Sequence, residues 1–164
     1  MELVTYPHRA LLEKTRPIET FDDELRSRID EMRRIMHESE GVGLAAPQVA
    51  WSAKLLILNP GDDPEADEVL INPTILKRRG RVMGEEGCLS FPGIYVAVER
   101  AKEIDVRYRT PTGEEKVETR ADFVARIIQH EIDHLENILL VHRMSPADRV
   151  RVKRDLEALT RPTG

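Results

Sequence analysis

The sequence predicts an α+β fold, in which antiparallel β-sheets pack around a central helix that carries the motif His-Glu-x-x-His, with an N-terminal helix and a C-terminal helix. Short β-type runs cluster between residues 53 and 119 and do not alternate with helical segments, as they would in a parallel α/β sheet. Apolar residues at helical spacing flank this cluster, over residues 21–38 and 121–136. The expected order is therefore helix, several strands, helix, helix.

The N-terminal helix is predicted over residues 21–38. Thr20, followed three residues later by Asp23, is typical of an N-terminal cap, and the helix should end before Gly41. Its apolar residues recur every three or four positions and should form one buried face. They are Phe21, Leu25, Ile29, Met32 and Met36.

Five β-type runs follow, and each is bounded by residues that favour turns. The last two are separated by Thr110-Pro111-Thr112-Gly113, which predicts a hairpin with a glycine-containing loop. The runs cover residues 55–58, 69–71, 94–98, 104–108 and 116–119.

The central helix is predicted over residues 121–136. Phe123, Ile127, His130 and His134 share one face of it, so two polar side chains lie within the stripe that should be buried. A histidine on a buried face needs a polar partner or a ligand. The functional question therefore concentrates on this helix.

The C-terminal helix is predicted over about residues 146–160. Ser145 is placed to cap its N-terminus, and Pro146 suits its first turn. Val152, Leu156 and Leu159 should face the core.

The composition is that of an ordinary folded protein, with 40% hydrophobic and 34% charged residues. No repeat or linker divides the 164 residues, so we expect one domain over residues 1–164. A formal net charge of −5 gives no support for general binding to DNA, which needs a strongly basic surface. No apolar run approaches the roughly 20 residues that span a bilayer, and the first residues do not resemble a signal peptide, so we expect a cytoplasmic protein that does not bind membranes.

The motif on the central helix spans Gln129-His130-Glu131-Ile132-Asp133-His134. Histidines four residues apart lie about 40° apart around a helix, so both imidazoles can reach one metal ion. Glu131 is then placed to act as a base beside the ion without binding it. In the alternative interpretation, the two histidines are core residues that hydrogen-bond to carboxylates.

A catalytic metal site usually has three protein ligands and one open position, so the two histidines need a third partner. Cys88 is the single cysteine and therefore cannot form an internal disulfide; it is an inert core residue, a nucleophile or a ligand. Downstream of the motif, Glu136, His142 and Glu157 are further candidates. The residue types alone leave this choice open.

Three segments resemble those of peptide deformylases. They are Gly41-Val42-Gly43-Leu44-Ala45-Ala46-Pro47-Gln48, Glu86-Gly87-Cys88-Leu89-Ser90 and His130-Glu131-Ile132-Asp133-His134. All three occur in the family's order, and the resemblance extends through Ile71-Asn72-Pro73 and Arg100 to about residue 145.

The resemblance implies that Cys88, His130 and His134 bind one divalent metal ion, with Fe²⁺ expected in the cell and Zn²⁺, Ni²⁺ or Co²⁺ possible in purified protein. A metal-bound water is then the nucleophile, because the ion lowers its pKa. Glu131 serves as general base and then as general acid. The implied reaction removes the formyl group from N-formylmethionyl peptides and releases formate.

The resemblance also assigns substrate contacts. Gln48 and the backbone N–H of Leu89 would donate to the oxyanion, Gly43 would lie beside the substrate backbone, and Ile127 would form a wall of the methionine pocket. Arg126 lies either near the mouth of that pocket or on the exposed side of the helix.

A basic cluster near the C-terminus either binds the ribosome, as this part of some family members does, or is a solvated helix face. It consists of Arg143, Arg149, Arg151, Lys153 and Arg154.

Three positions depart from the family pattern. Asn137 and Ala50 stand where glycine is frequent, and His142 stands where aspartate is frequent. Asparagine tolerates the left-handed conformation that ends a helix, so the change at Asn137 should be mild. None of the three is a proposed ligand or catalytic group.

Two other functions remain as alternatives. A metallopeptidase with a different third ligand would keep its metal after Cys88→Ala and would cut internal peptide bonds. A non-catalytic protein that binds peptide ends would have no need of Gln48, Cys88 and Glu131 together.

Overall fold

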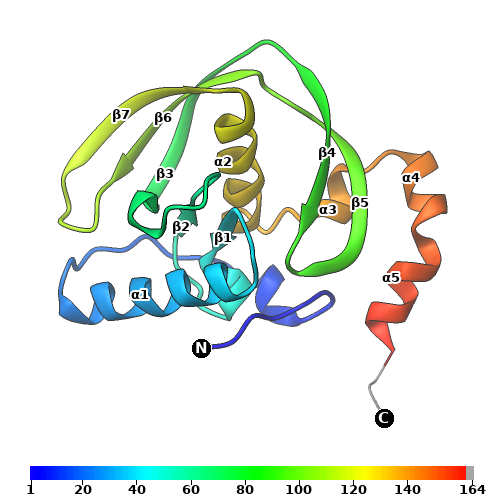
Figure 1. Ribbon diagram of the computed structural model, residues 1–164, viewed down its shortest axis with the longest axis horizontal. Helices are drawn as coiled ribbons and strands as arrows, with labels where there is room; N and C mark the ends of the chain where they lie inside the picture. The colour runs from blue at the N-terminus through cyan, green and yellow to red at the C-terminus, as the bar shows by residue number, and fades with distance from the viewer. Residues whose placement is uncertain (162–164) are drawn as a thin grey trace.

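A computed structural model describes residues 1–161 and confirms the α+β class (Figure 1). Within these residues, seven strands form two sheets, and the strands within each sheet pair antiparallel. The five-stranded sheet has the order β1 (Gly43–Ala45), β2 (Leu55–Leu58), β3 (Glu68–Arg79), β6 (Glu103–Arg109) and β7 (Glu115–Ala121). The second sheet is the hairpin of β4 (Val82–Cys88) and β5 (Phe91–Arg100).

The helices pack against these sheets. Within residues 1–161, none of them is both long enough and apolar enough to cross a membrane. The α-helices are α1 (Asp23–Glu38), α2 (Asp122–Leu135), α3 (Leu140–Arg143), α4 (Pro146–Arg151) and α5 (Lys153–Thr160). Short 3₁₀ helices are η1 (Arg9–Leu12), η2 (Ala46–Val49) and η3 (Pro64–Ala66).

Helix α1 begins at Asp23, two residues later than predicted. Its N-cap is Asp22, whose Oδ1 accepts a hydrogen bond of 3.0 Å from the N–H of Leu25, so the prediction of Thr20 as the cap was wrong. The carboxylate satisfies a free amide and also interacts favourably with the positive end of the helix dipole. The helix ends before Gly41, as predicted, where Glu40 has a positive φ of 57°.

The strand prediction missed β1 and β4 and found only part of β3. Strand β4 contains two glycines and two glutamates, which disfavour strands, yet it pairs with β5 from Val82 opposite Arg100 to Gly87 opposite Tyr95. The second half of β3 is polar but pairs with β6. Pairing with a neighbouring strand therefore overrides local propensity in both places.

Helix α2 lies between the five-stranded sheet and the hairpin (Figure 1). Ala125 and every residue from Ile127 to Leu135 are buried. Phe123 was expected on the buried face, but it is 52% exposed, because the first turn of α2 extends past the packed layers to the edge of a groove. Asn137 adopts a φ of 59° just after the helix, in agreement with the expected left-handed stop.

The C-terminal segment forms two helices and not one. Val152 has a ψ of 5° and interrupts the helix predicted over 146–160, which gives α4 and α5, and the preceding α3 was missed. The Ser145 cap is confirmed, since its Oγ accepts from the N–H of Asp148 at 3.1 Å. Val152 itself is 1% exposed, and this burial explains why the chain turns inward there.

The core is divided by the five-stranded sheet, because alternate residues of a strand face opposite sides. Leu55 and Ile57 of β2 pack toward α1, whereas Leu56 and Leu58 pack toward α2. A third apolar cluster joins the hairpin to the N-terminal segment and the C-terminal helices. The N-terminal segment and the C-terminal helices thus hold the hairpin in place, and Arg100 at the end of the same buried face of β5 reaches Asp133 of α2.

Candidate metal centre and peptide groove

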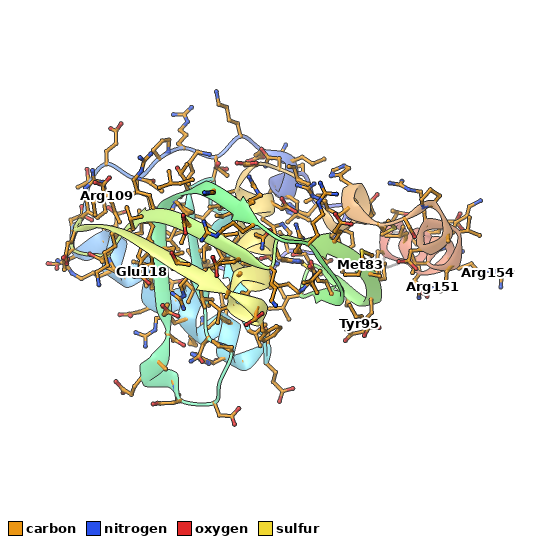
Figure 2. The ribbon with its side chains drawn as sticks, turned by 90° about the horizontal axis from the view of Figure 1, so that it is seen from above. Met83, Tyr95, Arg109, Glu118, Arg151 and Arg154 are labelled. Carbon is orange, nitrogen blue, oxygen red and sulfur yellow. The ribbon has the colours of Figure 1, made fainter. Side chains whose placement is uncertain are left out.

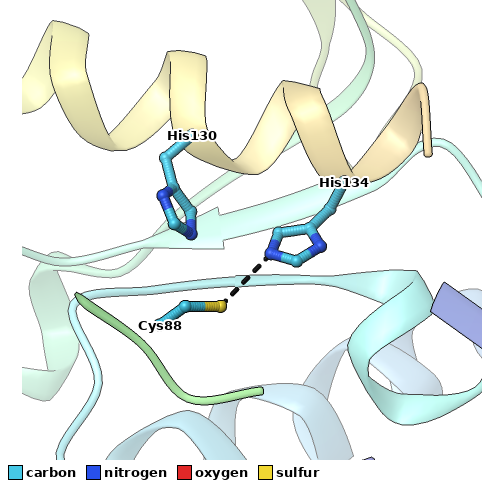
Figure 3. Close-up of side chains that lie close together, drawn as sticks. All are labelled: Cys88, His130 and His134. Carbon is cyan, nitrogen blue, oxygen red and sulfur yellow. Dashed lines mark hydrogen bonds between the residues drawn. The ribbon is translucent and has the colours of Figure 1, made fainter. Parts of the chain in front are cut away.

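Three potential metal ligands converge between the hairpin and α2. Cys88 ends β4, and His130 and His134 lie one turn apart on the buried face of α2 (Figure 3). One ligand atom from each side chain lies within 4.8 Å of the other two, and the Sγ of Cys88 is 3.3 Å from the Nε2 of His134. Within residues 1–161, this is the only group of three such side chains.

The other candidates for a third ligand lie elsewhere. Glu136 is exposed beyond the end of α2, and Glu157 is exposed on α5. The Nδ1 of His142 accepts a hydrogen bond of 2.8 Å from the N–H of Leu139. His142 therefore caps α3, which gives this departure from the family pattern a local structural role.

The side chain of Glu86 fixes the orientation of His130. Its Oε1 is 2.8 Å from the Nδ1 of His130, so the Nε2 of this ring remains available as a ligand atom of the candidate metal centre. Arg100 donates two hydrogen bonds of 2.9 Å to Glu86, and Arg126 donates a third of 2.6 Å. Such partners fix the ring orientation of a histidine ligand.

The same network continues behind α2. Arg100 donates to Asp133 at 2.6 Å, and Asp133 also accepts from Arg143 at 2.9 Å. Burial alone would raise the pKa of Glu86, but the hydrogen bonds from Arg100 and His130 outweigh it and lower the pKa to about 2. Glu86 is therefore a carboxylate at neutral pH.

Glu131 lies beside this group and is 5% exposed. Burial raises its pKa to about 7. Burial also lowers the pKa of His134 well below its usual value, which favours the neutral imidazole that binds metals. For His130 burial acts in the same direction, but the charge of Glu131 and contacts with Cys88 and Glu86 raise its pKa.

The residues present fit a divalent cation. Glu131 Oε1 and His134 Nδ1 are buried polar atoms with no hydrogen-bond partner in the described part of the chain. Buried polar atoms are rarely left in this state, so unpartnered atoms indicate an interaction with a ligand or an ordered water. One thiol with two imidazoles is a donor set that suits Zn²⁺ and Fe²⁺.

Gln48 reaches the same place from η2. Its Oε1 accepts from the N–H of Ala45 at 2.9 Å, and this contact directs its amide nitrogen toward the centre. The Nε2 lies 3.5 Å from the Sγ of Cys88 and 3.2 Å from the Oγ of Ser90. Ser90 in turn donates to the carbonyl of Val4 at 2.8 Å, so the N-terminal segment supports the site.

The centre lies at the floor of a groove of about 400 Å³. Gly43 and Ile127 line it, and so do Leu89 and Glu131. A Cβ on Gly43 would stand 2.6 Å from Glu131 Oε2 and 2.8 Å from Ile127 Cγ2, so only glycine fits there. Gly43 belongs to β1, an edge strand of the five-stranded sheet.

Arg126 lines this groove, and the interpretation that it is simply exposed was wrong. Besides its bond to Glu86, it donates to the carbonyls of Val98 at 3.0 Å and Val82 at 2.7 Å. Arg126 therefore connects α2 to both strands of the hairpin.

The sequence prediction missed the network of Glu86, Arg100 and Asp133. One signal for it was present. Along β5 the buried positions alternate through Ile94, Val96 and Val98 to Arg100, so an arginine occupies a core position of a period-two pattern. A charged residue at such a position indicates a buried ion pair.

A family model described as polypeptide deformylase matches residues 1–150 of the chain. The chain belongs to the polypeptide deformylase family. A peptide deformylase of Thermotoga petrophila is 41% identical over 152 residues, which cover 92% of this chain and 91% of the relative. Peptide deformylase 1 of Shewanella oneidensis is 39% identical over 157 residues, which cover 96% of this chain and 94% of the relative.

Solved structures of peptide deformylases have the same fold. The enzyme from Plasmodium falciparum aligns with a TM-score of 0.94 at 34% identity, over 96% of this chain and 94% of that one. Peptide deformylase 1B of Arabidopsis thaliana, in complex with an inhibitor, aligns with a TM-score of 0.90 at 40% identity, over 97% and 90% of the two chains. The expectation that this chain is an enzyme of that family is confirmed.

Proposed function

We propose that this enzyme removes the formyl group from N-formylmethionyl peptides and releases formate, with Cys88, His130 and His134 as ligands of one divalent metal ion. The observation that carries the proposal is the convergence of the three ligand atoms within 4.8 Å beside Glu131, at the floor of a groove. When bound, the ion would supply Lewis-acid chemistry and lower the pKa of a water molecule.

In this proposal, Glu131 moves the protons. It takes a proton from the attacking water and returns one to the amine nitrogen that leaves the formyl carbon. Its burial and the unpartnered Oε1 support this role, because no hydrogen bond within residues 1–161 occupies that oxygen.

Gln48 and the backbone N–H of Leu89 would stabilise the oxyanion that forms on the formyl oxygen. The positioning of Gln48 by Ala45 and Ser90 supports its role, since a prearranged donor contributes about 2.7–4 kcal/mol to such a step. Gly43 would leave room for the substrate backbone, and Ile127 would contact the methionine side chain.

We propose Fe²⁺ as the ion bound in the cell, with Zn²⁺, Ni²⁺ or Co²⁺ able to replace it in purified protein. The mixed thiolate and imidazole donors support all four, because affinity alone does not select among them. Anaerobic purification followed by elemental analysis and activity per metal tests this. Full activity of an air-exposed protein would contradict iron.

The Glu131→Gln variant tests the reaction. We expect kcat/KM for formate release from formyl-Met-Ala to fall by about 10²- to 10⁴-fold, because the proton carrier is lost, while the metal content stays unchanged. Glu136→Gln, at the exposed end of α2, is the matched control and should keep its activity. A wild-type protein that carries metal and releases no formate would contradict the proposal, and a Cys88→Ala variant that retains metal would favour a peptidase.

We also propose that residues 1–164 form one catalytic domain, since segments from both halves of the chain cover α2. Contact of the C-terminal basic cluster with the ribosome has less support than a solvated face. Arg143 pairs with Asp133, Arg149 donates to the carbonyl of Val141, and Arg151 pairs with Asp148. Arg151 also donates to the carbonyl of Tyr95 at 2.7 Å, and Figure 2 shows Arg154 at the outer end of the C-terminal helices.

A further inference from the structure

A second cavity, of about 470 Å³, lies against another face of α2 than the peptide groove does. Its wall from α2 consists of Gln129, Ile132, Asp133 and Glu136, whose spacing places them on one stripe of the helix. The turn between β3 and β4 and the end of β5 form other parts of the wall. No residue lines both spaces, and the volume is within the range of sites for small molecules.

Four arginines from separate parts of the chain line this space, which we call the arginine cavity. They are Arg78 and Arg81 on either side of Gly80, Arg100 at the end of β5, and Arg143 at the end of α3. The carboxylates in its wall belong to Glu99, Asp133 and Glu136, so the cations are in excess. Guanidinium groups that converge in this way are typical of sites for phosphate or carboxylate groups.

Arg78 and Arg81 have uncommitted guanidinium groups at the mouth of the cavity. Arg78 is exposed and forms no ion pair within residues 1–161. The side chain of Arg81 is 84% exposed, and its Nε lies 3.7 Å from Glu99 Oε1, which is too long for a hydrogen bond. Both arginines can therefore bind an anion without losing a hydrogen bond to another residue of the described chain.

Arg100 and Arg143 form the inner end of the cavity. Arg100, whose side chain is 5% exposed, donates three hydrogen bonds to Glu86 and Asp133, and Arg143 donates two to Asp133. A guanidinium group has five N–H donors, so both side chains keep donors that no acceptor within the described range occupies. Asp133 is also a single carboxylate between two guanidinium groups, which leaves this end favourable for an anion.

We propose that the arginine cavity binds a small molecule that carries a phosphate group. The phosphate oxygens would accept hydrogen bonds from Arg78, Arg81 and Arg143, and the rest of the ligand would contact Ile75 and Ile132. A phosphate monoester has a charge of about −1.5 to −2 at neutral pH, which matches two uncommitted guanidinium groups better than one carboxylate does. This site is additional to the proposed deformylation, because α2 separates it from the groove.

The test is a titration of the zinc-loaded, ¹⁵N-labelled protein with phenyl phosphate, inorganic phosphate and benzoate, followed by amide NMR at low, constant ionic strength. Phenyl phosphate should cause saturable shifts at Gly80 and Ala101, which line the cavity, and smaller ones at Gly43 in the groove. Benzoate should bind about tenfold more weakly, since it has one charge. About 0.5 M salt should weaken all binding, because it screens exposed charges.

Two phosphate probes separate the sources of the group. Tighter binding of phenyl phosphate than of inorganic phosphate would assign the site to a phosphate ester, because the ring can contact Ile75 and Ile132. Equal affinity would assign it to free phosphate. Affinity for benzoate equal to that for phenyl phosphate would overturn the assignment to phosphate.

The double variant Arg78→Gln/Arg81→Gln should bind phenyl phosphate at least about tenfold more weakly, because it loses two charged donors. Arg9→Gln/Arg154→Gln is the matched control, since it removes the same charge from exposed positions outside the cavity and should keep the affinity. Circular dichroism of both variants checks that they fold.

Three results would overturn the proposal. The first is the absence of saturable shifts at Gly80 and Ala101 with either phosphate. The second is strongest shifts at Gly43, which would place the phosphate at the candidate metal centre. The third is equal affinity for phenyl phosphate in the two double variants, which would reduce the binding to a general effect of charge.

Discussion

Glu86 accepts hydrogen bonds from Arg100, Arg126 and His130, and it is 6% exposed. One carboxylate thus positions a candidate metal ligand and compensates two buried cations. At such a buried position, loss of the negative charge should destabilise the fold more than a change of shape does. Arg100 and Arg126 would then lack a partner and could not be hydrated by water instead.

The Glu86→Gln variant should bind the metal about 10- to 100-fold more weakly and lose about 3 kcal/mol in its free energy of unfolding. The amide keeps the shape of the side chain but removes the charge that faces Arg100 and Arg126. Competition with a chelator and urea unfolding measure the two effects. Glu99→Gln, on the exposed face of β5, is the control, and equal metal affinity in both variants would contradict this role.

Ala50 adopts a φ of 58°, in the left-handed region that glycine adopts without strain. The Cβ of Ala50 is strained in this conformation by about 1–2 kcal/mol. Glycine would relieve that strain, and the extra conformational entropy that it gives the unfolded chain offsets only part of the gain. Ala50→Gly should therefore raise the free energy of unfolding by about 0.5–1 kcal/mol. Ala147→Gly, within α4, should lower it by a similar amount; if urea unfolding shows a loss in both variants, the backbone at Ala50 is not strained.

At the scale of elements, α1 is attached to the segment before β3 by one carboxylate. Asp67, whose side chain is 2% exposed, accepts from Arg33 at 2.8 Å and from Asn59 at 2.8 Å, and it lies 2.8 Å from the Nε2 of His37. Burial alone would raise the pKa of Asp67, but these hydrogen bonds lower it. The ionised form therefore stabilises the attachment of the helix.

The Asp67→Asn variant should lose about 2 kcal/mol in its free energy of unfolding at neutral pH. Because the folded-state pKa lies below the unfolded value of about 3.9, the contribution of Asp67 is fully present above that value and is lost as the pH falls below it. The difference between wild type and variant should then shrink below about pH 4. Urea unfolding across this range measures it, with Glu65→Gln as the exposed control, and a constant difference would argue against a charge effect.

At the scale of the whole molecule, segments near both ends of the described chain pack against the hairpin. Leu11 and Val152 both belong to the apolar cluster that includes Phe91 and Ile94 of β5. The position of Cys88, at the end of β4 and facing α2, thus depends on residues far from it in the sequence. The C-terminal helices contribute to the site through this packing.

Val152→Ala should lower the free energy of unfolding by about 2 kcal/mol, because two buried methyl groups are lost and a cavity remains. For a chain of this length, that corresponds to a decrease in Tm of about 4–8 °C. Val150, two residues earlier, is 76% exposed, so Val150→Ala should change Tm by less than about 2 °C. Equal shifts in thermal unfolding would contradict the assigned burial.

Much of the candidate site could be predicted because it consists of short segments whose residue types are specific to the chemistry. The spacing of His130 and His134 fixes their common face on any helix, and the segment around Cys88 supplied the third ligand by resemblance. The helix boundaries at Asp22 and Val152 could not be predicted. Several neighbouring residues can cap or interrupt a helix, and the contacts of the folded chain decide which of them does so.

The sequence by itself determined the fold class, the two long amphipathic helices before and after the strands, and the common face of His130 and His134, because periodicity and residue chemistry are local properties. The resemblance of a short segment added Cys88. Only the tertiary structure decided that β4 is a strand, that Phe123 lies at the groove, and that Glu86, Arg100 and Asp133 form one buried network. These features depend on contacts between residues distant in sequence. An unpaired buried charge or an unpaired strand edge is unfavourable, and the partner that removes this cost is brought near only by the folded chain.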